Sequence, residues 1–459
     1  MYRFALDDLK VWARQTPHKP IVLRGARQVG KSFLVRMLAE TCFDSLAEVN
    51  FEQRSDMTEL FASKQPDRIV SLLEIRLGQT IVPGKTLLFL DEIQAAPEVF
   101  ATLRYFYEKL PELHVIAAGS LLEFVLEEHT FSMPVGRVEY HHLGPMTFEE
   151  YLLATGHTQL FQLIQHFSWQ ESIERPIHGD LMALLQEYLV VGGMPEAVET
   201  FAKSRSFLAS DKVLGSILST YRDDFSKYRP RANPVRLAKV FSRIPGLVAN
   251  KLKYTQIDSD EKSRDLKQAL HQLENARIVY RVQHTHANGI PLGATVKEQH
   301  FKTIFLDVGL MCHACGLTMD DIQTAKDILL VNSGAVCEQF IGQHLLYAGY
   351  AYKEPELYCW FRLQGSSNAE VDYVIQQGST VIPVEVKAGK TGSLKSLHVF
   401  LQEKHCRLGL RFNADLPSIV EAQTSVAGTE PKSFHLVSLP LYLVGQAKRL
   451  CKEAITNML

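Results

Sequence analysis

A run of eight residues near the amino terminus has the types and spacing of a loop that binds phosphate. It matches the pattern GxxxxGK[ST] and consists of Gly25, Ala26, Arg27, Gln28, Val29, Gly30, Lys31 and Ser32. The glycines let backbone N–H groups face an anion at the start of a helix. We expect Lys31 to reach the β- and γ-phosphates of a nucleotide and the Ser32 hydroxyl to hold Mg²⁺. The pattern therefore predicts a site for Mg-ATP.

Two adjacent carboxylates follow a strongly apolar run farther along the chain. Asp91 and Glu92 come directly after residues 87–90, which read Leu-Leu-Phe-Leu. We expect Asp91 to bind Mg²⁺ through water as the acidic partner of Ser32. Glu92 would polarise the attacking water and act as the general base. Acids at the end of a buried strand are weak evidence alone, but after a phosphate loop they are its expected companion.

A polar residue also follows the next apolar run, His114 to Ala118. In ATPases with an extra strand between the two phosphate-site strands, a residue at this place touches the γ-phosphate or the attacking water. Ser120 is therefore the third catalytic candidate. The alternative is a plain turn, because Gly-Ser pairs are common turn residues.

Carboxylates and a lysine recur on two apolar segments near the carboxyl terminus. Asp372 lies in one, and Glu385 and Lys387 lie in the next. Because side chains alternate along a strand, Glu385 and Lys387 point to the same face. Two carboxylates at hairpin spacing could bind Mg²⁺ or Mn²⁺ and generate hydroxide, and the lysine would stabilise the transition state. An internal salt bridge between Lys387 and the acids is the alternative.

These residues resemble the PD-(D/E)xK nuclease core. The resemblance implies a metal site in which Glu338, on a helix from Ala335 to Leu346, adds a helical acid to Asp372 and Glu385. Lys390 and Lys395 follow and could contact backbone phosphates. A nuclease fold that keeps its acids but binds DNA or a protein partner without cutting is the other possibility.

The elements that must position the phosphate loop alternate between strands and helices. Strands are expected at 20–23, 47–51, 85–90 and 114–118, and helices at 31–41, 67–77 and 97–110. This order predicts a mostly parallel sheet covered on both faces. Helices dominate from about 145 to 220, with a break at Gly-Gly-Met-Pro, residues 192–195.

A helix followed by two alternating strands occupies the middle of the chain. The helix is expected at 261–276, and the strands at 278–282 and 301–306. This is the layout of a winged helix. Lys262, Arg264 and Lys267 would lie on the polar side of the helix, where they could meet phosphates. A protein contact or a solvated face is the alternative.

Taken together, these segments resemble the prokaryotic AAA+-type ATPases that carry a carboxy-terminal domain of unknown function with a nuclease-like fold. The resemblance covers nearly the whole chain and rests on GARQVGKS, FLDEIQ, AAGS, GRVEYHHLGPMTFEEYL, GGMPEAV, EVDYVI and PVEVKAG. It implies ATP binding more readily than a biological role. It also implies that Arg137 senses the γ-phosphate or acts as an arginine finger, with a surface salt bridge as the alternative.

Composition limits the class of protein. The formal net charge of −2 argues against a uniformly basic nucleic-acid coat but not against a local basic groove. The seven cysteines are dispersed, as in a reducing compartment, and the amino terminus has no apolar signal core. We therefore expect a cytoplasmic protein without a membrane segment.

The expected fold class is α/β: a P-loop AAA+-like parallel-sheet domain, a helical lid, a winged helix and a PD-(D/E)xK restriction-endonuclease-like domain. The expected boundaries are 1–145, 146–230, 231–325 and 326–459. The expected function is Mg-dependent ATP hydrolysis coupled to a module that acts on DNA or RNA, in a chain that could form a homo-oligomer. The alternative is a nucleotide-switched regulatory ATPase whose winged helix and inactive nuclease-like domain bind partners without cutting.

Overall fold

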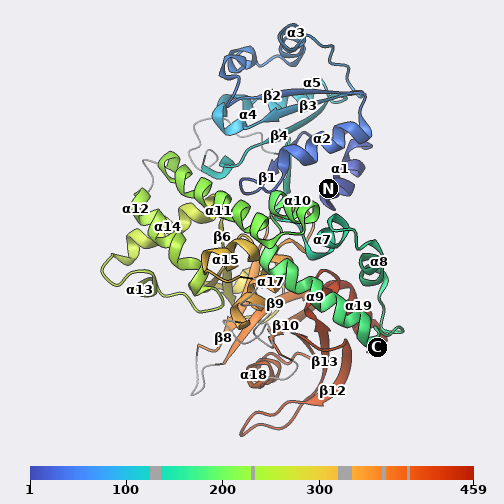
Figure 1. Cartoon of the computed structure of the whole chain (residues 1–459), viewed down its shortest axis with the longest axis vertical. Coiled ribbons are helices and arrows are strands. Elements are labelled where there is room, and N and C mark those ends of the chain that lie inside the picture. Colours follow the sequence, from blue (N-terminus) through green and yellow to red (C-terminus); the bar gives the residue numbers. More distant parts are fainter. Residues whose placement is uncertain (125–135, 229–232, 319–332, 364–368, 390–392, 459) are drawn as a thin grey trace. The chain divides into compact units, whose positions relative to one another are not determined.

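The computed structural model describes all residues except 125–135, 229–232, 319–332, 364–368, 390–392 and 459 (Figure 1). The chain forms two compact units. The first comprises residues 1–145, 275–277 and 349–355, and the second comprises 146–274, 278–348 and 356–459. The expected boundary at 145 coincides with the division between the units, whereas the three parts expected after it fall in one unit.

The first unit contains a five-stranded sheet in the order β2-β3-β4-β1-β5. All neighbouring strands are parallel. The strands are β1 (Ile21–Arg24), β2 (Ser45–Asn50), β3 (Thr86–Asp91), β4 (His114–Ala118) and β5 (Glu139–His142). The parallel sheet predicted from the sequence is confirmed. Strand β4 lies between β1 and β3, as the hypothesis for Ser120 requires.

Helices connect these parallel strands. They are α1 (Ala5–Ala13), α2 (Lys31–Cys42), α3 (Pro66–Leu77), α4 (Pro97–Phe100) and α5 (Leu103–Lys109), with 3₁₀ turns at η1 (Ser55–Phe61) and η2 (Ile93–Ala95). The helix predicted over 97–110 is therefore two shorter helices. Every residue of β3 is buried, which explains its continuous apolar run.

The second unit begins with helices. They are α7 (Phe148–Ala154), α8 (Thr158–His166), α9 (Arg175–Val191), α10 (Pro195–Ser204), α11 (Phe207–Asp224), α12 (Pro234–Arg243), α13 (Tyr254–Ile257) and α14 (Ser263–Asn275), with η3 (Phe225–Tyr228) and η4 (Ile244–Leu247). The predicted break separates α9 from α10. Glycine is needed there because a Cβ on Gly193 would lie 2.2 Å from the Met146 carbonyl oxygen.

An eight-stranded mixed sheet forms the rest of the second unit, in the order β12-β13-β11-β10-β9-β8-β6-β7. Its strands are β6 (Val279–Thr285), β7 (Val296–Phe305), β8 (Leu357–Phe361), β9 (Glu370–Gln377), β10 (Thr380–Val386), β11 (Leu408–Asn413), β12 (Ser418–Gln423) and β13 (Ser433–Pro440). The accompanying helices are α15 (Val308–Ala314), α17 (Ser333–Tyr347), α18 (Lys395–Lys404) and α19 (Ala447–Met458), with η5 (Leu292–Thr295) and η6 (Leu441–Gln446).

Helix α14 and the antiparallel hairpin β6–β7 match the elements predicted for the middle of the chain. The hairpin is not isolated, however, because β6 also pairs in parallel with β8. The boundary expected between 325 and 326 therefore divides strands of a single sheet. Within the described ranges, no helix combines the length and apolar character needed to span a bilayer.

Candidate functional sites

The phosphate loop connects the end of β1 to the start of α2. Gly30 caps α2 with a φ of 91°, in the left-handed region that favours glycine. Gly25 has a φ of 156°, and a Cβ there would lie 2.3 Å from the Leu143 carbonyl oxygen. Both glycines are thus required by the backbone path, which presents the first amides of α2 to an anion.

Lys31 is buried at the first position of α2. Its Nζ donates to the carbonyl oxygens of Gly25, at 2.9 Å, and Ala26, at 2.7 Å. Burial lowers the pKa of Lys31 to about 8, although the charges of Glu92 and Asp91 oppose that shift. Among the residues that the structure describes, no carboxylate contacts this ammonium group directly, and a phosphate would supply the missing negative charge.

The other loop residues shape the backbone or contact neighbours. The backbone φ of Gln28 is 63°, and the Val29 carbonyl accepts a hydrogen bond from Arg3 Nη1 at 2.8 Å. Arg27 Nη2 lies 3.5 Å from Glu52 Oε1. These contacts hold the loop from outside.

Ser32 and Asp91 meet at the carboxyl end of β3. Ser32 Oγ donates to Asp91 Oδ2 at 2.9 Å, and Asn50 Nδ2 at the end of β2 lies 3.5 Å from the same oxygen. Burial raises the pKa of Asp91. A hydroxyl and a carboxylate in contact with each other supply the hard oxygen donors that Mg²⁺ prefers, so Ser32 and Asp91 fit the expected Mg²⁺.

Glu92, predicted to be the general base, lies beside Ser120, predicted to touch the γ-phosphate or the attacking water. Its Oε2 accepts a hydrogen bond from Gln94 Nε2 at 2.6 Å and from Ser120 Oγ at 3.4 Å. Gln94 was missed, although it stands in the same FLDEIQ segment, two positions after the glutamate. A Cβ on Gly119 would lie 2.3 Å from Gln94 Oε1, so Gly119 leaves room for this amide.

Arg137 is not brought to the phosphate loop of its own chain. Ile21 of β1 pairs with Glu139 of β5, so Arg137 lies at the amino ends of the strands, whereas the loop follows their carboxyl ends. Arg137 Nε donates instead to Glu108 Oε1 on α5 at 3.0 Å. The surface salt bridge that the sequence left open is therefore present, and a sensor role within the same chain does not fit this position.

The carboxy-terminal acids lie on the hairpin β9–β10. Tyr373 pairs with Val384, which places Asp372 opposite Glu385 one step along the ladder. Asp372 Oδ2 accepts the Val386 amide at 2.8 Å, and Glu385 Oε1 accepts Lys387 Nζ at 2.6 Å. Burial and the charge of Asp372 raise the pKa of Glu385 to about 7. The internal Lys387–Glu385 ion pair left open above is thus present.

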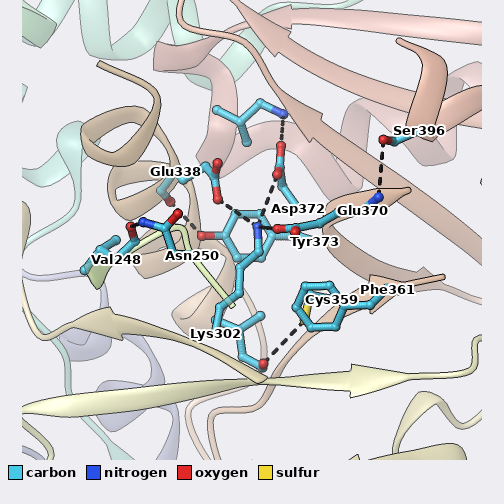
Figure 2. Close-up of polar contacts among 12 residues, drawn as sticks. Val248, Asn250, Lys302, Glu338, Cys359, Phe361, Glu370, Asp372, Tyr373 and Ser396 are labelled. Atoms are coloured by element: carbon cyan, nitrogen blue, oxygen red, sulfur yellow. Dashed lines mark hydrogen bonds and ion pairs between the residues drawn. The ribbon is translucent and has the colours of Figure 1, made fainter. Parts of the chain in front are cut away.

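A second lysine, from β7, reaches Asp372 and two further acids (Figure 2). Lys302 Nζ lies 3.1 Å from Glu338 Oε2 on α17 and 3.3 Å from Asp372 Oδ1, and it also pairs with Glu370. Burial alone would lower the pKa of Lys302, but the three carboxylates together raise it well above its usual value. Burial, followed by the charge of Asp372, raises the pKa of Glu338.

Sequence reasoning missed both Lys302 and Glu370. A signal existed for each: Lys302 is a charged residue between Phe301 and the apolar pair Ile304-Phe305, and Glu370 stands two positions before Asp372, on the same face of β9. Of the two basic residues expected to follow the acids, Lys395 is exposed at the start of α18, and Lys390 lies outside the described residues.

The metal ligands expected near the carboxyl terminus are paired with lysines. In the part of the chain that the structure describes, no three His, Cys, Asp or Glu side chains are grouped so that they could hold a metal ion. The carboxylates of Glu338, Asp372 and Glu385 contact lysine ammonium groups instead. The site as it stands therefore does not fit the Mg²⁺ or Mn²⁺ expected there.

Three family models match the chain. Residues 17–152 match "AAA domain", residues 182–321 match "Domain of unknown function (DUF8612)" and residues 333–439 match "Domain of unknown function (DUF4143)". No curated protein matches. The first match and the parallel sheet together give the amino-terminal unit the fold of a P-loop ATPase domain.

Solved structures give distant similarities. The Walker-type ATPase PABY2304 of Pyrococcus abyssi is 15% identical, with 68% of this chain and 94% of that chain covered and a TM-score of 0.43. Aeropyrum pernix ORC2, in ADPNP–ADP complexes, is 12% identical, with 71% of this chain and 94% of that chain covered and a TM-score of 0.34. The Thermotoga maritima RuvB Holliday junction branch migration motor is 15% identical, with 61% of this chain and 86% of that chain covered and a TM-score of 0.26.

Proposed function

We propose that the chain binds and hydrolyses Mg-ATP at the phosphate loop. The observation that carries this proposal is a pair of side-chain contacts at the carboxyl ends of the neighbouring strands β3 and β4. Ser32 contacts Asp91 at 2.9 Å, and Glu92 lies 3.4 Å from Ser120. These pairs supply a metal partner and a general base beside a loop whose lysine lacks a carboxylate contact.

Each residue has a defined task in this proposal. The first amides of α2 and Lys31 bind the phosphates, and Ser32 and Asp91 hold Mg²⁺, which would neutralise phosphate charge when bound. Glu92 orients a water molecule and accepts its proton. Ser120 and Gln94 hold the Glu92 carboxylate, and Ser120 also contacts the γ-phosphate or the water.

For the second unit, we propose a nuclease-like domain that binds nucleic acid or protein. The order α17-β8-β9-β10-α18-β11 supports this, with β8, β9 and β10 antiparallel and β11 parallel to β10. The exposed Lys262, just before α14, and the exposed Arg264 and Lys267 on α14 support contacts of a winged-helix-like region with phosphates. The lysine-paired acids favour the alternative in which the domain binds without cutting, under the control of the nucleotide state.

Phosphate release from ATP tests the first proposal. Wild type should release phosphate with Mg²⁺ and stop in EDTA, and Lys31→Ala should be inactive in both. Equal turnover in wild type and Lys31→Ala would contradict the proposal.

Incubation with labelled single- and double-stranded DNA and RNA, with Mg²⁺ or Mn²⁺ and with or without ATP, tests the proposal for the second unit. Retarded but intact nucleic acid supports binding without cutting, whereas metal-dependent fragments support a nuclease.

A further inference from the structure

The carboxylate cluster of the second unit contains its own cation. The Lys302 side chain is only 2% exposed, and three carboxylates surround its ammonium group. Glu338 comes from α17, Glu370 and Asp372 come from β9, and Lys302 comes from β7. Burying an ammonium or a carboxylate costs several kcal/mol per ion, so these groups are tolerated only because they compensate one another.

Four of the oxygens that would ligate a metal already have partners. Asp372 uses Oδ1 for Lys302 and Oδ2 for the Val386 amide, at 3.3 and 2.8 Å. Glu338 Oε2 faces Lys302, and Glu385 Oε1 faces Lys387. Glu385 Oε2 is buried without a hydrogen-bond partner among the described residues.

We infer that the Lys302 ammonium is the resident cation of this cluster and takes the place that a divalent metal ion would otherwise occupy. The cluster therefore ties α17 to β7 and β9 as an ion-paired core and does not act as a metal-dependent phosphodiesterase. This inference is independent of ATP hydrolysis at the phosphate loop, and either can fail without the other.

Divalent metal binding to the nucleotide-free full chain tests the inference. Wild type should show no Mn²⁺ binding that depends on Asp372 or Glu385, by titration calorimetry of wild type against Asp372→Asn and Glu385→Gln. Mn²⁺ binding by wild type that either substitution abolishes would overturn the inference. In this experiment Lys302 is present in every protein compared.

Removal of the lysine gives the converse test. Lys302→Met leaves the carboxylates without their cation, so the variant should be destabilised in EDTA and should recover with Mn²⁺. Its Tm should rise by about 5 °C or more at Mn²⁺ roughly a hundredfold above Kd, whereas the Tm of wild type should not move. Lys297→Met is the matched control, because Lys297 is an exposed lysine of the same strand. A Lys302→Met protein as stable as wild type in EDTA would contradict the inference.

A charge-matched variant covers the case in which Lys302→Met does not fold. Lys302→Met combined with Glu338→Gln and Glu370→Gln removes the cation together with two of its anions. This triple variant should fold without metal and should not respond to Mn²⁺. If it stays unfolded, as judged by circular dichroism, Lys302 is needed for its packing and not as a cation, and the inference is wrong.

Discussion

Two buried lysines differ in what surrounds the ammonium group. Lys31 contacts backbone carbonyls, and burial lowers its pKa to about 8. Lys302 contacts three carboxylates, which raise its pKa although burial opposes them. Within the described part of the chain, the first lysine has no carboxylate partner and would gain an anion from a bound phosphate, whereas the second already has its anions. At the scale of single residues, this difference separates a ligand site from an ion-paired core.

Lys31→Ala tests the phosphate role. The substitution removes the charge-assisted contacts to phosphate, so ATP affinity should fall about a hundredfold, on the order of 3 kcal/mol. Fluorescence titration with a labelled ATP analogue measures the change. Lys19→Ala, outside the loop, serves as the control and should bind as wild type does. Unchanged affinity in Lys31→Ala would exclude this lysine from the site.

Ser120→Ala tests the third catalytic candidate. The substitution removes a hydroxyl that lies 3.4 Å from Glu92 Oε2. We expect kcat to fall roughly tenfold to a hundredfold with little change in KM, because the contact matters most when charge develops in the transition state. Steady-state phosphate release measures both constants. Wild-type kcat in this variant would favour the plain turn.

At the scale of elements, the sequence predicted those segments whose signal is local. The apolar run before Asp91 and the phosphate loop after β1 were predicted because each has a sequence pattern contained within a few consecutive residues. The pairing of β6 with β8 was not predicted, since it joins segments more than seventy residues apart. Lys302 was missed for the same reason, because its carboxylate partners lie on α17 and β9.

Helix α7 carries a buried carboxylate that should make stability depend on pH. Burial raises the pKa of Glu149 from 4.5 to about 7, although Gln446 Nε2 donates to it at 2.8 Å. Between these pH values the unfolded chain loses the proton first, so the folded state binds more protons and the free energy of unfolding falls as pH rises.

Glu149→Gln should remove this dependence while keeping an oxygen that can accept the Gln446 hydrogen bond. We expect stabilisation on the order of 1–3 kcal/mol at pH 8 and much less at pH 5. Urea unfolding at both pH values measures it. Glu196→Gln, at an exposed position of α10, is the control. Destabilisation by Glu149→Gln at pH 8 would show that the carboxylate is needed in its charged form.

At the scale of the whole molecule, Arg137 bears on assembly. It lies at the amino ends of the strands, away from the phosphate loop of its own chain, and pairs with Glu108. If it serves a nucleotide, that nucleotide belongs to another copy of the chain. A homo-oligomer would then complete each site with an arginine from its neighbour.

Mixing two inactive variants tests this arrangement. Lys31→Ala lacks a working loop, and Arg137→Ala lacks the arginine. In mixed oligomers some sites would combine an intact loop with an intact arginine, so hydrolysis should partly recover. Native mass spectrometry verifies that mixed species are present. Mixed oligomers without recovered activity would leave Arg137 as a surface salt bridge.

Single-turnover hydrolysis by Glu92→Gln tests whether ATP is hydrolysed at the phosphate loop with Glu92 as the base. Neutralising the carboxylate while keeping its shape should preserve ATP binding and slow phosphate release by about a hundredfold or more. The same preparation should therefore hold unhydrolysed ATP, which quantitative analysis of the bound nucleotide detects. Phosphate release at the wild-type rate, with the same ATP affinity, would contradict the claim.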